Sequence, residues 1–521
     1  MKTHFLTLLN YKLMNFKTIS VGVLLMVSAL TVYSQATNDS SKKFRRSSIY
    51  SIMVHSDSID KKLQADDETA ANSNVIKNLI KSVASDDSKS LKVDPVVVKN
   101  LFPTIAIPQQ FNDFNLSTRI IELDNFGITE ADIKAAEESA GGEKKKKGFG
   151  GLAGKAMGAV GVDASKMPAL PGTDNVTKSM KAIANKFFEK ENTAANLVAK
   201  WYNYSDAAKD GGSHYDMGTI QDKGIYSISA EDKRKFEASG EANSKIIDDA
   251  VNLIGHTYVM LNYFKYRSNA AIIAELQTYA DALGSMGGVA GVAASQAVGA
   301  AVSSMAGGGY SVQTNTYLYR LDWANETNEK FYNECWSGTL EDLIKSGMCK
   351  LTFVGKEKSR AGVRVGAFSK TDPNELIKRA VLRSLDENIA RLQASHEDFR
   401  TITPICGVDT KAGEIYAEIG LRENLTPGDE YEVLQPIEGS DGTITYKSIG
   451  KFKPVEGKIC DNREGAAEDI AEDLQSTDAK VKEAAEKVKG LTNSTFKGGK
   501  VKEEYTGCFL RLTKKAKSKN K

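Results

Sequence analysis

Four stretches of the chain have the pattern of apolar residues, or the β-branched and aromatic content, that predicts a β-strand. The first lies within RRSSIYSIMVHSD (45–57), and the others are TYVMLNYFKY (257–266), YSVQTNTYLYRLDW (310–323) and CKLTFVG (349–355). The stretch 310–323 is the best strand candidate by its alternation and aromatic content. In contrast, Pro103 and Pro108 predict that 101–116 runs extended, without a helix.

Apolar residues spaced by three and four positions predict three long helices. One runs from 174 to 202, and a second, from 229 to 254, begins with a capping-box variant at Ser229 and Asp232. The third opens at Asp372-Pro373, a capping residue followed by a first-turn proline. Its apolar stripe comprises Leu376, Ala380, Val381, Leu385, Ile389, Leu392 and Phe399. We interpret this stripe as a core face, with a partner-binding face as the alternative.

From Thr401 onward, short strands joined by Gly-Asp turns predict a small barrel or sandwich. A charged helical segment at 465–491 interrupts it, and YTGCFLRL (505–512) is expected to return as the strand that completes the domain. The basic residues after Leu512 have nothing to bury, so we expect them to be dispensable.

These patterns predict an α+β fold, with a mixed antiparallel sheet and long helices followed by a small β-barrel-like domain that carries a helical insertion. The expected organisation is a signal peptide (1–34), an N-terminal α/β segment (35–137), a Gly/Lys-rich linker or insertion (138–172), a central α+β domain (173–400) with a glycine-rich insert (284–309), a C-terminal β domain (401–513) with a helical insertion (465–491) and a basic tail (514–521).

The N-terminus has the pattern of a signal peptide. Three lysines accompany an apolar run from Ile19 to Val32 that is too short for a good spanning helix, and small residues precede a cleavage point at Ser34. We therefore expect a secreted protein that is periplasmic, outer-membrane-associated or extracellular.

Charge argues against nucleic acid as a partner. The 521 residues include 69 basic and 67 acidic side chains, a formal charge of +2, which becomes −1 without the three lysines of 1–34. Such a chain has no overall field that attracts nucleic acid. The cysteines are Cys335, Cys349, Cys406, Cys460 and Cys508, and this odd number leaves at least one thiol unpaired within a chain. We interpret most of them as small buried residues.

Small residues recur at every fourth position from Gly287 to Gly307, the spacing that allows two helices to pack closely. The stretch contains too few strongly apolar residues to insert as a lone transmembrane helix. We interpret it as a loosely packed insertion, with a self-associating helix and a membrane contact as alternatives. No transmembrane span is expected, and peripheral membrane contact stays open.

The stretches ANLVAKWYNYSDAAKDGGSHYDMGTIQDKGIYSIS, TYLYRLDW and IGLRENLTPGDEYEVLQPI resemble a family of exported proteins of unknown function from Gram-negative bacteria. The resemblance spans roughly 45–513, apart from the two glycine-rich inserts. The C-terminal part is similar, more loosely, to the small β domain of flagellar and curli assembly accessory proteins, although Cys460 stands where that domain has tryptophan. The resemblance implies kinship and no catalytic residue.

Motifs for catalysis, metal binding and phosphate binding are missing from the sequence, including H-E-x-x-H, EF-hand, G-x-S-x-G and phosphate-loop patterns. His214 and Asp216, in GGSHYDMG, could act as ligands, but a polar turn is the preferred interpretation. We therefore assign no catalytic, cofactor-binding or metal residue and no cofactor.

The expected function is that of a non-enzymatic envelope protein: a scaffold, an assembly accessory or a binding module, with other envelope proteins or itself as partner. The alternatives are a membrane-active or pore-associated protein that uses the glycine-zipper segments, and a hydrolase with dispersed site residues.

Overall fold

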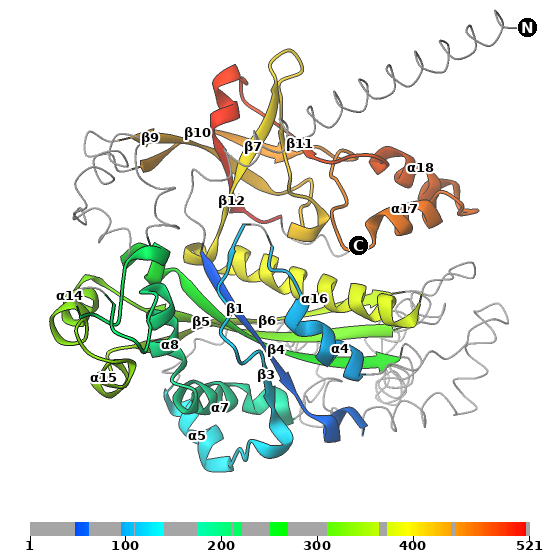
Figure 1. Ribbon diagram of the computed structural model, residues 1–521. Coiled ribbons are helices and arrows are strands. Elements are labelled where there is room, and N and C mark those ends of the chain that lie inside the picture. Colours follow the sequence, from blue (N-terminus) through cyan, green and yellow to red (C-terminus); the bar gives the residue numbers. More distant parts are fainter. Residues whose placement is uncertain are drawn as a thin grey trace, which may run out of the picture.

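The computed structural model describes residues 47–61, 95–108, 110–139, 175–209, 212–220, 251–268, 310–363, 372–438 and 444–516. The insert 284–309, the linker 138–172 apart from its first two residues and most of the predicted helix 229–254 lie outside these ranges. The described residues form an α/β domain with a barrel domain stacked on one side of it (Figure 1).

The α/β domain is built on one mixed sheet with strand order β2-β1-β4-β5-β6. Its strands are β1 (Ser48–His55), β2 (Asn112–Asp113), β3 (Ile120–Glu122), β4 (Thr257–Ser268), β5 (Tyr310–Asp322) and β6 (Lys350–Val363). Strand β1 runs parallel to β2, β3 and β4, whereas β4, β5 and β6 form an antiparallel meander. All eight side chains of β1 are buried, as expected for an inner strand covered on both faces. The 35–137 and 173–400 stretches thus contribute to one sheet.

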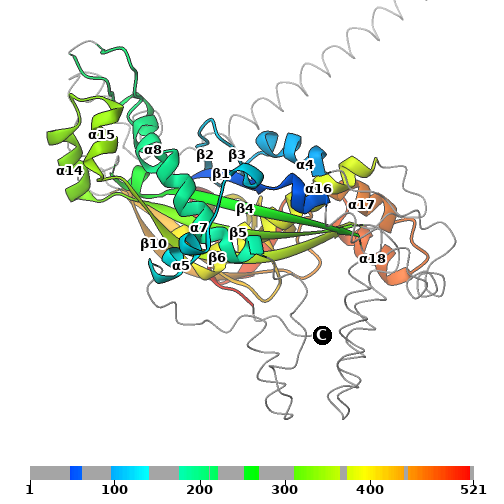
Figure 2. The ribbon, with the colours of Figure 1, turned by 90° about the horizontal axis from the view of Figure 1, so that it is seen from below.

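Helices cover both faces of this sheet. One face carries α7 (Asn175–Lys190) and α8 (Thr193–Trp201), with α5 (Glu130–Ser139), α14 (Asn325–Glu334) and α15 (Leu340–Ser346) at its margins. Figure 2 shows α7 and α8 on the side of the sheet turned away from the barrel domain. The other face carries α4 (Pro95–Leu101), the 3₁₀ turn η1 (Phe102–Thr104) and the long helix α16 (Pro373–Ser395).

Helix α16 confirms the interpretation of its apolar stripe as a core face. Asp372 caps the helix through Oδ1, which accepts a hydrogen bond from the Asn374 N–H at 3.0 Å. The stripe residues from Leu376 to Leu392 and Phe399, which follows in the turn η4 (Glu397–Phe399), are all buried against the sheet.

Two local predictions are wrong. The single helix expected over 174–202 is divided into α7 and α8, because Asn192 takes a left-handed conformation (φ 46°) that interrupts the helix. The stretch 101–116 also contains the 3₁₀ turn η1, which accepts Pro103 because a proline in the first turn has no N–H bond to lose.

The C-terminal domain is a closed six-stranded barrel with strand order β10-β11-β8-β7-β12-β9. Its strands are β7 (Ile402–Asp409), β8 (Glu414–Ala417), β9 (Glu430–Glu438), β10 (Ile444–Pro454), β11 (Ser494–Gly498) and β12 (Phe509–Lys514). The predicted helical insertion consists of two helices, α17 (Ala466–Asp473) and α18 (Ala479–Val488). Two 3₁₀ turns complete the domain, η5 (Leu421–Glu423) and η6 (Glu503–Gly507).

Strand β12 completes the barrel, as its sequence predicts. It pairs with β7 on one side and β9 on the other, and Leu510 contributes to a barrel core that includes Val433, Phe452 and Phe496. The sequence reasoning missed β11, which is short and follows directly on a charged helix.

The basic tail differs from its prediction, because its first residues neutralise a buried charge. The Asp429 carboxylate, which is fully buried, accepts a hydrogen bond from the Lys515 ammonium at 2.7 Å and another from the Ala516 N–H at 2.8 Å. Lys515 also donates to the Asn424 carbonyl. A buried carboxylate that loses its cation is destabilising, so these residues belong to the barrel domain.

No helix within the described ranges has the length and apolar character that crossing a bilayer requires.

We expect a chain ending after Thr513 to be less stable than one ending after Ala516. The shorter chain leaves Asp429 buried without the Lys515 ammonium and the Ala516 N–H, and with only the Thr426 N–H as a donor, which should cost about 2–4 kcal/mol. Thermal unfolding of both chains measures the difference, and the full-length Lys515→Met variant should reproduce most of it. Equal melting temperatures of the two truncated chains would contradict the proposed role of the tail.

Candidate functional site

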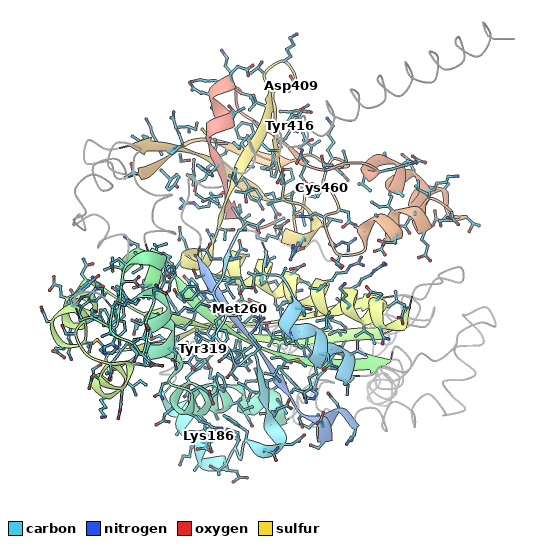
Figure 3. The ribbon with its side chains drawn as sticks, in the orientation of Figure 1. Lys186, Met260, Tyr319, Asp409, Tyr416 and Cys460 are labelled. Carbon is cyan, nitrogen blue, oxygen red and sulfur yellow. The ribbon has the colours of Figure 1, made fainter. Side chains whose placement is uncertain are left out.

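The junction between the two domains contains a polar groove of about 600 Å³. One wall is formed by Leu101, Ile105 and neighbouring residues at the end of α4, and the opposite walls come from α16 and the barrel domain. In Figure 3, Met260 in the sheet and Cys460 in the barrel domain mark the two sides of this junction.

Helix α16 supplies the charged side of the junction. Arg379, Arg383 and Asp386 follow one another at spacings of four and three, so they lie on one face of the helix, away from its apolar stripe. Arg379 and Asp386 are both buried. This second face of α16 is therefore covered by the barrel domain.

The two arginines meet the acidic start of α17. Arg383 lies 2.7 Å from a carboxylate oxygen of Asp469, and Arg379 lies 3.3 Å from one of Glu468. The Arg383 guanidinium also donates to the Glu464 carbonyl at 2.6 and 3.1 Å. These contacts place the helical insertion of the barrel against the α/β domain.

A glycine makes this close approach feasible. Gly465 precedes α17 with φ +72°, a left-handed conformation that favours glycine. A β-carbon at this position would lie 2.3 Å from Nε of Arg379. A residue with a side chain at 465 would therefore force the Arg379 side chain to shift.

A second ion pair joins α16 to the turn η5. Arg422 Nε donates to Asp386 Oδ2 at 2.9 Å, and the Arg422 N–H donates to Asn462 Oδ1 at 2.9 Å. Burial raises the pKa of Asp386 to about 6, and the charge of Arg422 opposes this shift. Asp386 therefore carries a charge that is expensive to bury near neutral pH.

The polar side chains of the groove are mostly charged and paired. Among the described residues that line it there is no histidine, serine or cysteine, and its charged groups pair with each other, as Arg463 does with Asp461 at 2.6 Å. Self-paired charges leave little net field for a charged substrate. The ion pairs between α16 and the barrel domain hold the two domains together at this groove.

His214 and Asp216 do not converge on a common point. The Asp216 carboxylate accepts hydrogen bonds from the Gly218 N–H at 2.7 Å and from Asn203 Nδ2 at 2.9 Å, and it pairs with Lys209. His214 Nδ1 lies 3.0 Å from the Ser205 carbonyl. These contacts fit a polar turn. The glycine-zipper segment lies outside the described residues.

The sequence reasoning missed the junction. The sequence analysis considered only the apolar stripe of this helix and assigned no role to Arg379, Arg383 and Asp386. The one signal in the sequence was the acidic stretch AAEDIAED at the start of the inserted helix, whose charge is opposite to that of Arg379 and Arg383. The sequence alone does not show that this stretch and the arginines are in contact.

The chain matches no protein-family model and no curated protein.

We expect Asp386→Asn to change the pH dependence of stability. Because the native pKa of Asp386, about 6, lies above its unfolded value of about 3.9, the native state binds this proton more tightly. The wild type should therefore lose stability relative to the variant as pH rises from about 4.5 to about 7, by about 1–3 kcal/mol. Urea unfolding of both proteins at the two pH values measures this difference. Parallel pH profiles would show that Asp386 does not carry the effect.

We expect Arg383→Glu to loosen the two domains, because it places a carboxylate beside Asp469. The cost should be about 1–3 kcal/mol and should appear as a separate unfolding step of the barrel in calorimetry. Adding Asp469→Arg should restore much of the coupling, since the pair is then reversed. Failure of the double variant to recover would mean that the ion pair does not join the domains.

Proposed function

We propose that the protein is an exported, non-enzymatic component of the bacterial envelope that acts as a scaffold or assembly accessory. Its partners are other envelope proteins or further copies of itself. The observation that carries this proposal is the junction, where one helix serves as core for the α/β domain and as an ionic anchor for the barrel. A protein that must present two domains in a fixed arrangement benefits from such a connection.

The chemistry of the cysteines also supports a non-enzymatic role. All five thiols are free, and burial raises the pKa of each. Because the thiolate is the nucleophile, a raised pKa disfavours a catalytic cysteine at neutral pH. The five cysteines are therefore poor candidates for the nucleophile of a hydrolase.

Surface positions on both domains allow a direct test in living cells. Ile437 near the end of β9 is 41% exposed, and the Glu341 side chain on α15 is 73% exposed. A photo-crosslinking residue placed at either position reports what each domain contacts. The two positions serve as controls for each other, because a random collision partner would be captured equally by both.

We expect fractionation to place the protein in the periplasm or with the outer membrane. Irradiation should give a discrete product, with an envelope protein or a second copy, that differs between the two positions. Arg383→Glu should weaken that product without changing the compartment. Retention in the cytoplasm, or no discrete product at either position, would overturn the proposal.

A further inference from the structure

A second cluster of charged side chains lies outside the junction, at the carboxyl ends of the parallel strands β1 and β3. His55, the last residue of β1, is paired in register with Glu122, the last residue of β3. Asp57 lies two residues after His55, at the start of a short helical turn over 57–61. Ligand sites in open α/β sheets form at such carboxyl ends.

We propose that His55, Asp57 and Glu122 bind a divalent transition-metal cation such as Zn²⁺. One imidazole nitrogen and two carboxylate oxygens from these residues lie within 4.8 Å of one another. A mixed nitrogen and oxygen set of three protein ligands is a common zinc environment, in which a water or another ligand takes the fourth position. Within the described ranges no other group of His, Cys, Asp and Glu converges in this way.

His55 is held as metal-binding histidines are usually held. It is only 2% exposed, its Nε2 lies 2.8 Å from Asp57 Oδ1, and its Nδ1 lies 3.4 Å from Asp60 Oδ2. Asp60 is itself buried. A carboxylate behind the second ring nitrogen fixes the orientation of the ring and raises its basicity toward a metal. Asp60 is therefore a positioning residue.

Asp124 keeps the loop that carries Asp57 in place. Its carboxylate accepts hydrogen bonds from the hydroxyls of Ser56 and Ser58, at 2.8 and 2.5 Å, and from the Ser58 N–H at 3.2 Å. With both oxygens engaged, Asp124 is a support for the site and not one of its ligands. A preformed loop reduces the cost of ordering ligands when a metal binds.

The balance of charge favours a cation. Four carboxylates, those of Asp57, Asp60, Glu122 and Asp124, surround His55, whereas Lys99 is the one ammonium paired with them among the described residues. Lys99 Nζ lies 2.7 Å from Glu122 Oε1, which leaves Oε2 for a second partner. The Asp57 and Glu122 side chains are 52% and 40% exposed, so an ion can enter from solvent.

A buried tyrosine lies close enough to Asp60 to feel its charge. Tyr266 on β4 lies on the same face of the sheet as His55, and its hydroxyl is buried without a hydrogen-bond partner among the described residues. The charge of Asp60 acts on this hydroxyl and adds to the effect of burial in raising its pKa. A buried hydroxyl without a partner is costly, so this hydroxyl adds to the unbalanced polar groups around Asp60 among the described residues.

The test is zinc binding by the untagged full-length chain after removal of metals with a chelator. Calorimetric titration with ZnCl₂ should show one site per chain, and zinc should raise the melting temperature. Asp57→Asn and Glu122→Gln preserve shape and remove one ligand charge each, so each should weaken zinc binding at least about tenfold. Asp60→Asn should weaken it less. Glu189→Gln, an exposed acid on α7, is the matched control and should bind as the wild type does.

Co²⁺ serves as a spectroscopic probe of the histidine ligand, because its visible absorption depends on the ligands that coordinate it. The His55→Gln variant should lose the absorption that the wild type shows with Co²⁺. Circular dichroism identifies variants that fail to fold, and Asp57→Asn, at an exposed side chain, keeps the test valid if His55→Gln is unstable. No saturable binding, or the same zinc affinity in the wild type and either ligand variant, would overturn the site. His55 would then serve only as a structural contact between Asp57 and Asp60.

Discussion

Helix α16 has to bury two faces of unlike chemistry, and the arrangement of both domains depends on how it does so. Its apolar stripe from Leu376 to Leu392 packs on the sheet, while Arg379 and Arg383 on another face meet the acidic start of α17. Apolar burial supplies most of the stability of the helix. The ionic face contributes little net stability, since charged pairs are costly to desolvate. It mainly determines the geometry in which the two domains dock, since such pairs favour one arrangement over others.

The two polar clusters differ in how their charge is balanced. At the junction, arginines and carboxylates come from different domains and neutralise each other across the interface, as Arg422 and Asp386 do. Around His55, the residues come from one domain and carboxylates outnumber cations. Among the residues that the structure describes, the charges of the first cluster are balanced, whereas the second cluster has more carboxylates than cations. We therefore assign cohesion to the junction and ligand binding to the strand ends.

Sequence patterns predicted the elements of this fold well where a single periodicity dominates. Strands β1, β4 and β5 and helix α16 were expected close to their observed bounds, because their apolar positions repeat at two or at three to four residues. The division at Asn192 was missed because it rests on one backbone angle. Neither polar cluster could be predicted, since the pairing of His55 with Glu122 and of Arg383 with Asp469 depends on strand register and domain docking.

The position of β1 also constrains the order in which the chain can fold. This inner strand pairs in parallel with β4, which begins only at Thr257. The backbone hydrogen bonds on that side of β1 therefore form only after a segment about 200 residues further along the chain has joined the sheet. Loop closure over such a separation slows folding. Until β4 arrives, an apolar strand with an open edge is exposed to other chains, which is a hazard for aggregation. A chain of this topology gains from a chaperone that covers SIYSIMVH until the sheet closes.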